Sequence, residues 1–178
     1  MTARRVFLKW LAAAPAATTL LPASSRAAGV DPGRGHVRVE DDRIGLHFDD
    51  DMRCRIVHKH GPRTQALTRF DASAALALKG RRVERFALVS ADPFAGATPF
   101  GPGQSLRLVG RSTDGVEKQV TVTLLDAYPG SALLDVVYVN HGATALEIES
   151  ASSVSHRLLA APRHAGGWWS YSDRKSVV

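Results

Sequence analysis

The chain has 178 residues, of which 44% are apolar, and a formal charge of +6 at pH 7. The positive charge is concentrated at the two ends: the first 27 residues carry four bases and no acid, and the last six carry two bases against one acid. Residues 28–172 therefore have a net charge of only +1, and they show no stripe of Lys and Arg interleaved with aromatic residues. Composition thus argues against nucleic acid as a partner.

Length and cysteine content limit the architecture. The roughly 145 residues between the two ends are enough for one domain with a sizeable core. The chain has a single cysteine, Cys54. An internal disulfide framework is therefore excluded.

Residues 1–27 have the order of an export signal: a basic region, a moderately apolar stretch over 10–21, and small residues before a predicted cut after Ala27. The basic region resembles a twin-arginine signal, which implies the translocase of that route as a partner and a periplasmic or extracellular destination. The apolar stretch is too short to cross a bilayer core of roughly 30 Å. An uncleaved amphipathic anchor is the alternative. The residues that match the twin-arginine pattern are Arg4, Arg5, Phe7, Leu8 and Lys9.

The first half of the predicted domain, 36–172, reads as short strands after a flexible lead-in over 28–35. Residues 36–40, 43–48 and 53–58 are predicted strands, and Ile44, Leu46 and Phe48 should face the core. The acidic run 49–51 lacks the oxygen spacing of a calcium loop and predicts a solvated turn. Further strands are expected over 71–78 and 86–90. The segment 91–103, rich in Pro and Gly, predicts a long loop of the kind that often lines a site.

The second half is organised around residues 116–140. Apolar residues alternate with polar ones up to Leu124, which predicts a half-buried strand, whereas 132–140 is apolar on both parities and predicts a central strand covered on both faces. A strand over 105–109 should reach the first run through a hairpin at Asp114 and Gly115. Residues 145–149 alternate again. Four consecutive antiparallel strands are implied, and the fold class predicted is an all-β antiparallel sandwich.

No motif for nucleophilic, nucleotide or redox chemistry occurs in the chain. Cys54, His58 and His60 share one parity of a predicted strand, and a thiolate with two imidazoles would suit zinc or copper. No fourth ligand has a diagnostic spacing, so ordinary packing is the preferred interpretation. No cofactor is predicted.

Residues 124–131 read LLDAYPGS, the strand 136–140 ends in Tyr-Val-Asn, and residues 167–171 read GWWSY. These patches resemble the amino-terminal β-supersandwich of bacterial α-galactosidases of glycoside hydrolase family 36, a likeness that spans roughly residues 36–172. In that family the catalytic aspartates belong to a following (β/α)8 barrel. The resemblance therefore implies a non-catalytic domain of an exported α-galactosidase-type enzyme, with no catalytic residue of its own.

The aromatic patch is the one candidate site that the resemblance suggests. Trp168, Trp169 and Tyr171 are expected either to pack against the barrel of the same chain or to stack on carbohydrate. Residues 173–178, DRKSVV, match what a widely used sequencing adapter encodes in one reading frame, which predicts an artefactual tail on an interrupted gene. The competing hypothesis is an exported stand-alone carbohydrate-binding or structural β-sandwich.

Replacing Arg4 and Arg5 together by Lys should leave the precursor in the cytoplasm. The reason is that the receptor reads a guanidinium pair and not charge alone. Cell fractionation followed by immunoblotting measures the outcome. Undiminished mature protein outside the cytoplasm would exclude this route.

Overall fold

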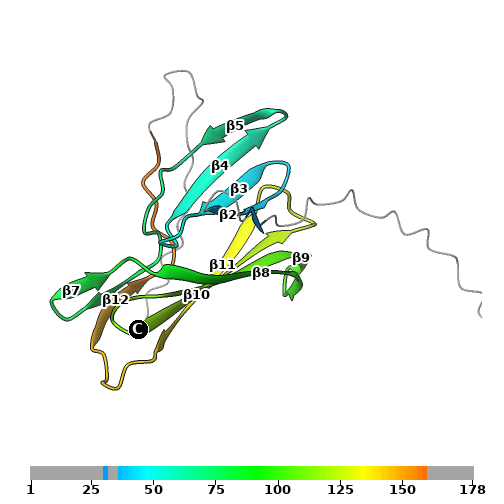
Figure 1. Cartoon of the computed structure of the whole chain (residues 1–178). Coiled ribbons are helices and arrows are strands. Elements are labelled where there is room, and N and C mark those ends of the chain that lie inside the picture. The colour runs from blue at the N-terminus through cyan, green and yellow to red at the C-terminus, as the bar shows by residue number, and fades with distance from the viewer. Residues whose placement is uncertain (1–29, 32–35, 160–178) are drawn as a thin grey trace, which may run out of the picture.

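The computed structural model describes residues 30–31 and 36–159, and within them the chain is all-β and antiparallel (Figure 1). The predicted fold class is confirmed: three sheets pack around a shared core in a sandwich-like arrangement. The described residues form no helix, and so contain no helical membrane span.

A five-stranded sheet follows the chain order β1-β2-β3-β4-β5. It confirms the three strands predicted over 36–58. Residues 49–51 form the expected turn, but Asp49 is buried and not solvated. The Asp49 carboxylate accepts the Arg53 backbone N–H at 2.9 Å and pairs with the Arg53 side chain at 2.8 Å. The strands are β1 (Val30–Asp31), β2 (His36–Glu40), β3 (Ile44–Phe48), β4 (Cys54–His60) and β5 (Arg63–Ala66).

A four-stranded sheet has the order β11-β10-β9-β8 and includes the expected hairpin at Asp114 and Gly115, where Gly115 has a φ of +77°. Two expectations for this region are wrong. Residues 91–103 are not a loop, because β8 and β9 extend through them as a long hairpin; Pro93 is tolerated there because β8 is an edge strand. The strands are β8 (Ala87–Thr98), β9 (Gly101–Arg111), β10 (Val116–Leu125) and β11 (Ala132–Asn140).

The second wrong expectation concerns which strand is central. The strand β11, expected to be central, lies at an edge of the sheet, and its outer-face residue Val137 is 44% exposed. The neighbouring β10 is the strand buried on both faces. In this protein an edge strand has apolar residues on both of its faces, and the apolar residues of one face point outward.

A third sheet has the order β12-β6-β7 and lies beside the other two (Figure 1). The predicted strand at 145–149 is displaced to β12 (Ile148–Ser152), which pairs with β6 and not with β11. The strand expected over 71–78 is shortened to β6 (Ala75–Leu78), followed by β7 (Arg81–Val83). The chain thus leaves the four-stranded sheet after β11 instead of adding a further strand to it.

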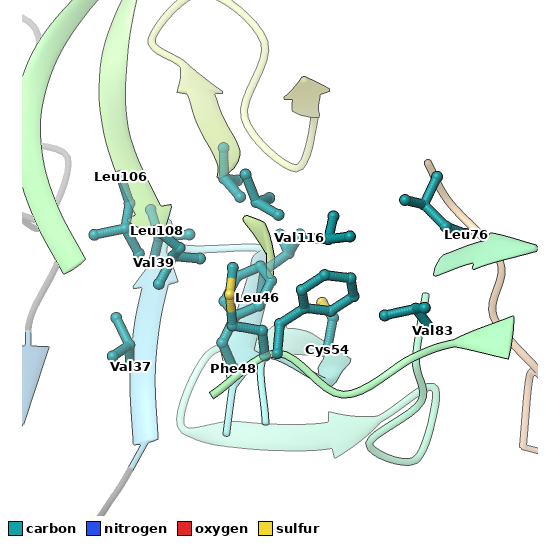
Figure 2. Close-up of a cluster of buried hydrophobic side chains, with 14 of the residues drawn as sticks. Val37, Val39, Leu46, Phe48, Cys54, Leu76, Val83, Leu106, Leu108 and Val116 are labelled. Carbon is teal, nitrogen blue, oxygen red and sulfur yellow. The ribbon is translucent and has the colours of Figure 1, made fainter. Parts of the chain in front are cut away.

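The core lies where the inner faces of the three sheets meet (Figure 2). Leu46 and Phe48 point inward as predicted, and Ile44 is partly buried against the same cluster. Removing each such side chain from water contributes about 1.5–3 kcal/mol, so this cluster is the main favourable term in folding. Its remaining members include Val37, Val39, Cys54, Leu76, Val83, Leu106, Leu108, Val116, Val120 and Val122.

Asp41 joins the turn between β2 and β3 to the turn between β10 and β11. One carboxylate oxygen accepts the N–H groups of Arg43 and Ile44 at 2.6 and 2.7 Å, and the other accepts the Gly130 N–H at 2.7 Å. Gly130 has a φ of +88°, a conformation that favours glycine. The Tyr-Pro-Gly turn is therefore fixed to the opposite sheet by one side chain.

Lys118 is fully buried on the core face of β10. Its ammonium group donates to the carbonyl oxygens of Ala74 at 3.3 Å and Met52 at 3.5 Å, and lies 4.4 Å from the centre of the Phe86 ring. Burial lowers the pKa of Lys118 to about 8, whereas burial raises the pKa of the nearby Cys54 thiol to about 12. The core therefore contains two groups whose titration is linked to folding.

Lys118 should raise the free energy of unfolding by about 1 kcal/mol between pH 8 and 9, because over that interval the unfolded chain binds more protons at Lys118, whose ordinary pKa is 10.5, than the folded chain does. The unfolded Cys54 thiol, whose ordinary pKa is 9.0, loses its proton over the same range while the folded thiol keeps it, so Cys54 offsets part of this rise below pH 9 and most of it above pH 9. Urea unfolding across this range measures both effects.

Lys118→Met should abolish the rise between pH 8 and 9. The exposed Lys79 offers a matched control, since Lys79→Met removes the same group from the surface and should leave the rise intact. A Lys118→Met protein whose stability climbs as steeply as that of the parent would contradict this account of the core.

Candidate functional site

Most site residues predicted from the sequence lie outside the described residues. These are the export-signal residues Arg4, Arg5, Phe7, Leu8 and Lys9, and the aromatic patch of Trp168, Trp169 and Tyr171. Their proposed roles stay predictions. A site within the described residues is therefore identified by the chemistry of those residues alone.

The structure does not bring Cys54, His58 and His60 together. Cys54 is buried at the start of β4, whereas the two histidines are exposed toward its other end, beside an open depression of about 860 Å³. A strand rises about 3.3 Å per residue, which puts Cys54 and His58 about 13 Å apart. No group of three His, Cys, Asp or Glu side chains in the described ranges could hold a metal ion. Sharing a strand face is not sufficient for ligation.

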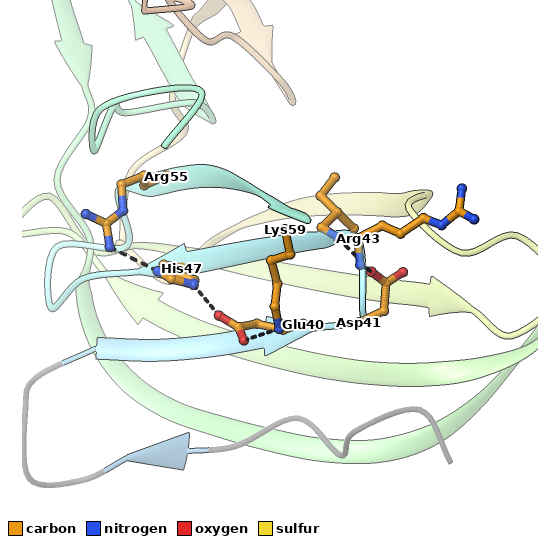
Figure 3. Close-up of polar contacts among 7 residues, drawn as sticks. Glu40, Asp41, Arg43, His47, Arg55 and Lys59 are labelled. Atoms are coloured by element: carbon orange, nitrogen blue, oxygen red, sulfur yellow. Dashed lines mark hydrogen bonds and ion pairs between the residues drawn. The ribbon is translucent and has the colours of Figure 1, made fainter. Parts of the chain in front are cut away.

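A charged network covers the outer face of the five-stranded sheet (Figure 3). His47 on β3 contacts Glu40 on β2 through Nε2 at 2.6 Å, and the other Glu40 oxygen accepts from Lys59 at 2.9 Å. On its far side, His47 Nδ1 lies 3.0 Å from an Arg55 guanidinium nitrogen, and that guanidinium covers the Phe70 ring at 4.6 Å. The register of β2, β3 and β4 sets these neighbours side by side.

The electrostatics of this network indicate a neutral imidazole. Burial lowers the pKa of His47, and the Glu40 carboxylate opposes this only in part. Burial alone would raise the pKa of Glu40, but the hydrogen bonds from Lys59 and His47 outweigh it, so its pKa is lowered. A neutral ring donates from Nε2 to Glu40 and accepts at Nδ1 from Arg55, which satisfies both nitrogens. The network is paired except at Arg55, whose buried Nε has no hydrogen-bond partner among the described residues, and it is a structural feature.

A different arrangement lines an open hollow of about 890 Å³ beside β7 of the three-stranded sheet. One wall is the segment 69–72, a second is β7 with the residue that follows it, and the third is the segment 155–159. Three arginines, one histidine and two carboxylates surround it. The charged and titratable lining residues are Arg69, Asp71, Arg82, Glu84, His156 and Arg157.

Backbone hydrogen bonds hold two of these walls together. Thr68 and Leu158 form an isolated antiparallel bridge, and the Leu159 N–H donates to the Leu67 carbonyl at 2.8 Å. Asp71 is anchored to the sheet in turn, because its backbone exchanges hydrogen bonds with Cys54 at 2.9 and 3.0 Å. The hollow thus has a rigid base formed where the chain crosses back from β12.

Several donors at this hollow have no partner among the described residues. Both ring nitrogens of His156 are buried without a hydrogen bond, and burial lowers its pKa against the opposing effect of Asp71. The Arg69 and Arg157 side chains make no hydrogen bond or ion pair within the described residues. Arg82 pairs with Glu84 at 2.5 Å. The hollow therefore presents two guanidinium groups that make no ion pair, whereas on the outer face the buried Arg55 Nε is the group left without a hydrogen bond among the described residues.

Sequence reasoning did not find this hollow. Its residues come from three separate segments, none of which carries a motif, and the stretch 153–159 gave no strand signal. The one signal available was a clustering of arginines near residues 69, 82 and 157, which is common on any solvated surface.

Comparison with known protein families found no matching family model, and a search of curated proteins found no match to the chain.

Replacing His156 by Phe should raise the free energy of unfolding by about 1 kcal/mol in the absence of ligand. The substitution keeps a ring of similar shape and removes a buried polar group that has no partner among residues 36–159, which otherwise costs about 1–3 kcal/mol. Urea unfolding measures the change. A loss of stability would instead show that solvent in the hollow already satisfies the imidazole.

Proposed function

We propose that the chain is the non-catalytic β-sandwich domain of an exported glycoside hydrolase of the α-galactosidase type. The support comes from the sequence resemblance together with the antiparallel sandwich that the described residues adopt. The carbohydrate substrate and the catalytic barrel are, in this proposal, the partners of the domain.

The observation that carries the proposal is that the residues behind the resemblance have definite structural roles. The Tyr-Pro-Gly turn is the one that Asp41 binds through Gly130. Tyr138 of the Tyr-Val-Asn strand end donates its hydroxyl to the Ser152 carbonyl at 3.2 Å, and burial raises its pKa to about 12. A resemblance concentrated in fold-determining positions supports a shared architecture.

Asn140, the last residue of the same strand, closes the following turn. Its side-chain oxygen accepts the Gly142 N–H at 2.9 Å, and its amide nitrogen donates to the Thr144 carbonyl at 2.8 Å. These bonds direct the chain out of β11 and toward the three-stranded sheet. The motif therefore fixes a chain path and has no part in chemistry.

The enclosed carboxylates of the described residues are occupied in structural contacts, which supports a non-catalytic role. Glu40 binds Lys59 and His47, Asp49 binds Arg53, and Asp41 accepts backbone N–H groups. A glycosidase needs one carboxyl that can give up a proton and a second that can attack or activate water, about 5–5.5 Å away in a retaining enzyme. The lowered pKa of Glu40 is the opposite of what a general acid needs.

The 178-residue chain should not hydrolyse p-nitrophenyl α-galactoside, whereas a protein that joins it to the proposed catalytic barrel should. Both proteins are assayed under the same conditions by release of nitrophenol. Turnover by the 178-residue chain that disappears when one of its own Asp or Glu residues is changed would refute the proposal. A joined protein that is inactive but binds galactosides would favour a carbohydrate-binding module.

A further inference from the structure

We infer that the hollow lined by Arg69, Arg82, His156 and Arg157 binds a small ligand through an oxyanion, a carboxylate or a phosphate. The inference uses none of the residues of the aromatic patch and does not depend on the proposed glycosidase role. It rests on the placement of two arginines, on the balance of charge around the hollow and on the unpaired donors.

The placement of Arg69 and Arg157 is the first argument. Because Thr68 bridges Leu158 in antiparallel register and Leu159 bonds to Leu67, Arg69 and Arg157 occupy directly opposite positions on adjacent segments. Residues so placed have Cβ atoms about 4.5–5.5 Å apart, and like charges at such positions are destabilising. Both side chains line the same hollow. Two guanidinium groups side by side form a fork that suits the oxygens of one oxyanion.

The charge balance is the second argument. Three arginines face the hollow against two carboxylates, and one of those carboxylates, Glu84, is already paired with Arg82. The other, Asp71, accepts the backbone N–H of Arg157 at 3.4 Å. A backbone N–H does not neutralise a carboxylate, so three arginines against two carboxylates leave an excess of one positive charge, and neither the Arg69 nor the Arg157 guanidinium makes an ion pair within the described residues. An oxyanion would turn their mutual repulsion into two charge-assisted contacts.

The third argument is the buried imidazole. A buried donor without a partner is rare in folded proteins and needs a reason. The His156 ring nitrogens lie in the wall of the hollow and have no partner in the described part of the chain. The unpaired imidazole marks this wall of the hollow, although its nitrogens are themselves shielded from solvent. The arginine pair and the excess of positive charge indicate the kind of ligand.

Isothermal titration calorimetry of the full chain at low ionic strength tests the inference, with sodium D-galacturonate, inorganic phosphate and neutral D-galactose as probes. We expect saturable binding of galacturonate or phosphate and much weaker binding of galactose. Galacturonate and phosphate together distinguish a sugar carboxylate from a free phosphate as the source of the oxyanion. Raising the salt concentration to about 0.5 M should weaken binding, since the arginines are exposed to solvent.

Variants locate the site. Arg69→Gln and Arg157→Gln should each weaken binding about tenfold or more, because each removes a charged hydrogen-bond donor to the anion. Arg85→Gln is the matched control: this exposed arginine follows Glu84 but does not line the hollow, and its loss should change affinity less than twofold. Circular dichroism checks that each variant is folded.

Three results would overturn the inference. They are the absence of saturable binding by both anions, binding of galactose as tight as that of the anion that binds, and Arg69→Gln and Arg157→Gln proteins that bind as well as the parent. The galactoside assay uses a neutral substrate, so failure of the anion to bind would leave the proposed function untouched. Failure of the galactoside assay would likewise leave the anion site untouched.

Discussion

The burial of the Lys118 ammonium group is the constraint on which the arrangement of the three sheets depends. An isolated buried charge is costly, so its donors have to be satisfied inside the protein. Here they reach the carbonyls of Ala74 and Met52, and the Phe86 ring lies beside them. Met52 precedes β4, Ala74 precedes β6 and Phe86 precedes β8. The Lys118 side chain on β10 therefore contacts the residues that precede one strand of each sheet. These directional contacts position the three sheets more specifically than apolar packing alone would.

The same rule of satisfying buried polar groups separates the two charged regions of the molecule. On the outer face of the five-stranded sheet, His47 uses both ring nitrogens, because Glu40 and Arg55 lie on either side of it. In the hollow, His156 has the same chemistry but no partner among the described residues. Polar groups that are already hydrogen-bonded stabilise the fold and have little capacity left for a ligand, whereas unpaired groups can form new contacts with one. The outer-face network also has a buried donor without a partner, the Arg55 Nε, so what marks the hollow as a site is that Arg69 and Arg157 line it without an ion pair among the described residues.

The sequence alone predicted the class of the fold and several of its strands, because hydrophobic alternation with a period of two is a local property. It placed Ile44, Leu46 and Phe48 toward the core and identified the hairpin at Gly115. It wrongly predicted β11 as a central strand and residues 91–103 as a loop. Local composition does not determine whether a strand lies at the edge of a sheet, or that β8 pairs with β9. Strand parity likewise says nothing of distance along the strand, and the structure does not bring Cys54, His58 and His60 together.

What the sequence by itself determined is therefore the all-β character, the turns that need Asp and Gly, and the identity of the apolar residues that a core would use. Only the tertiary structure decided which sheet each strand joins, and hence that β12 leaves its sequence neighbour to pair with β6. It alone set Arg69 opposite Arg157, which are 88 positions apart in the chain. Long-range pairing depends on the burial of all the faces at once, so no single segment encodes it.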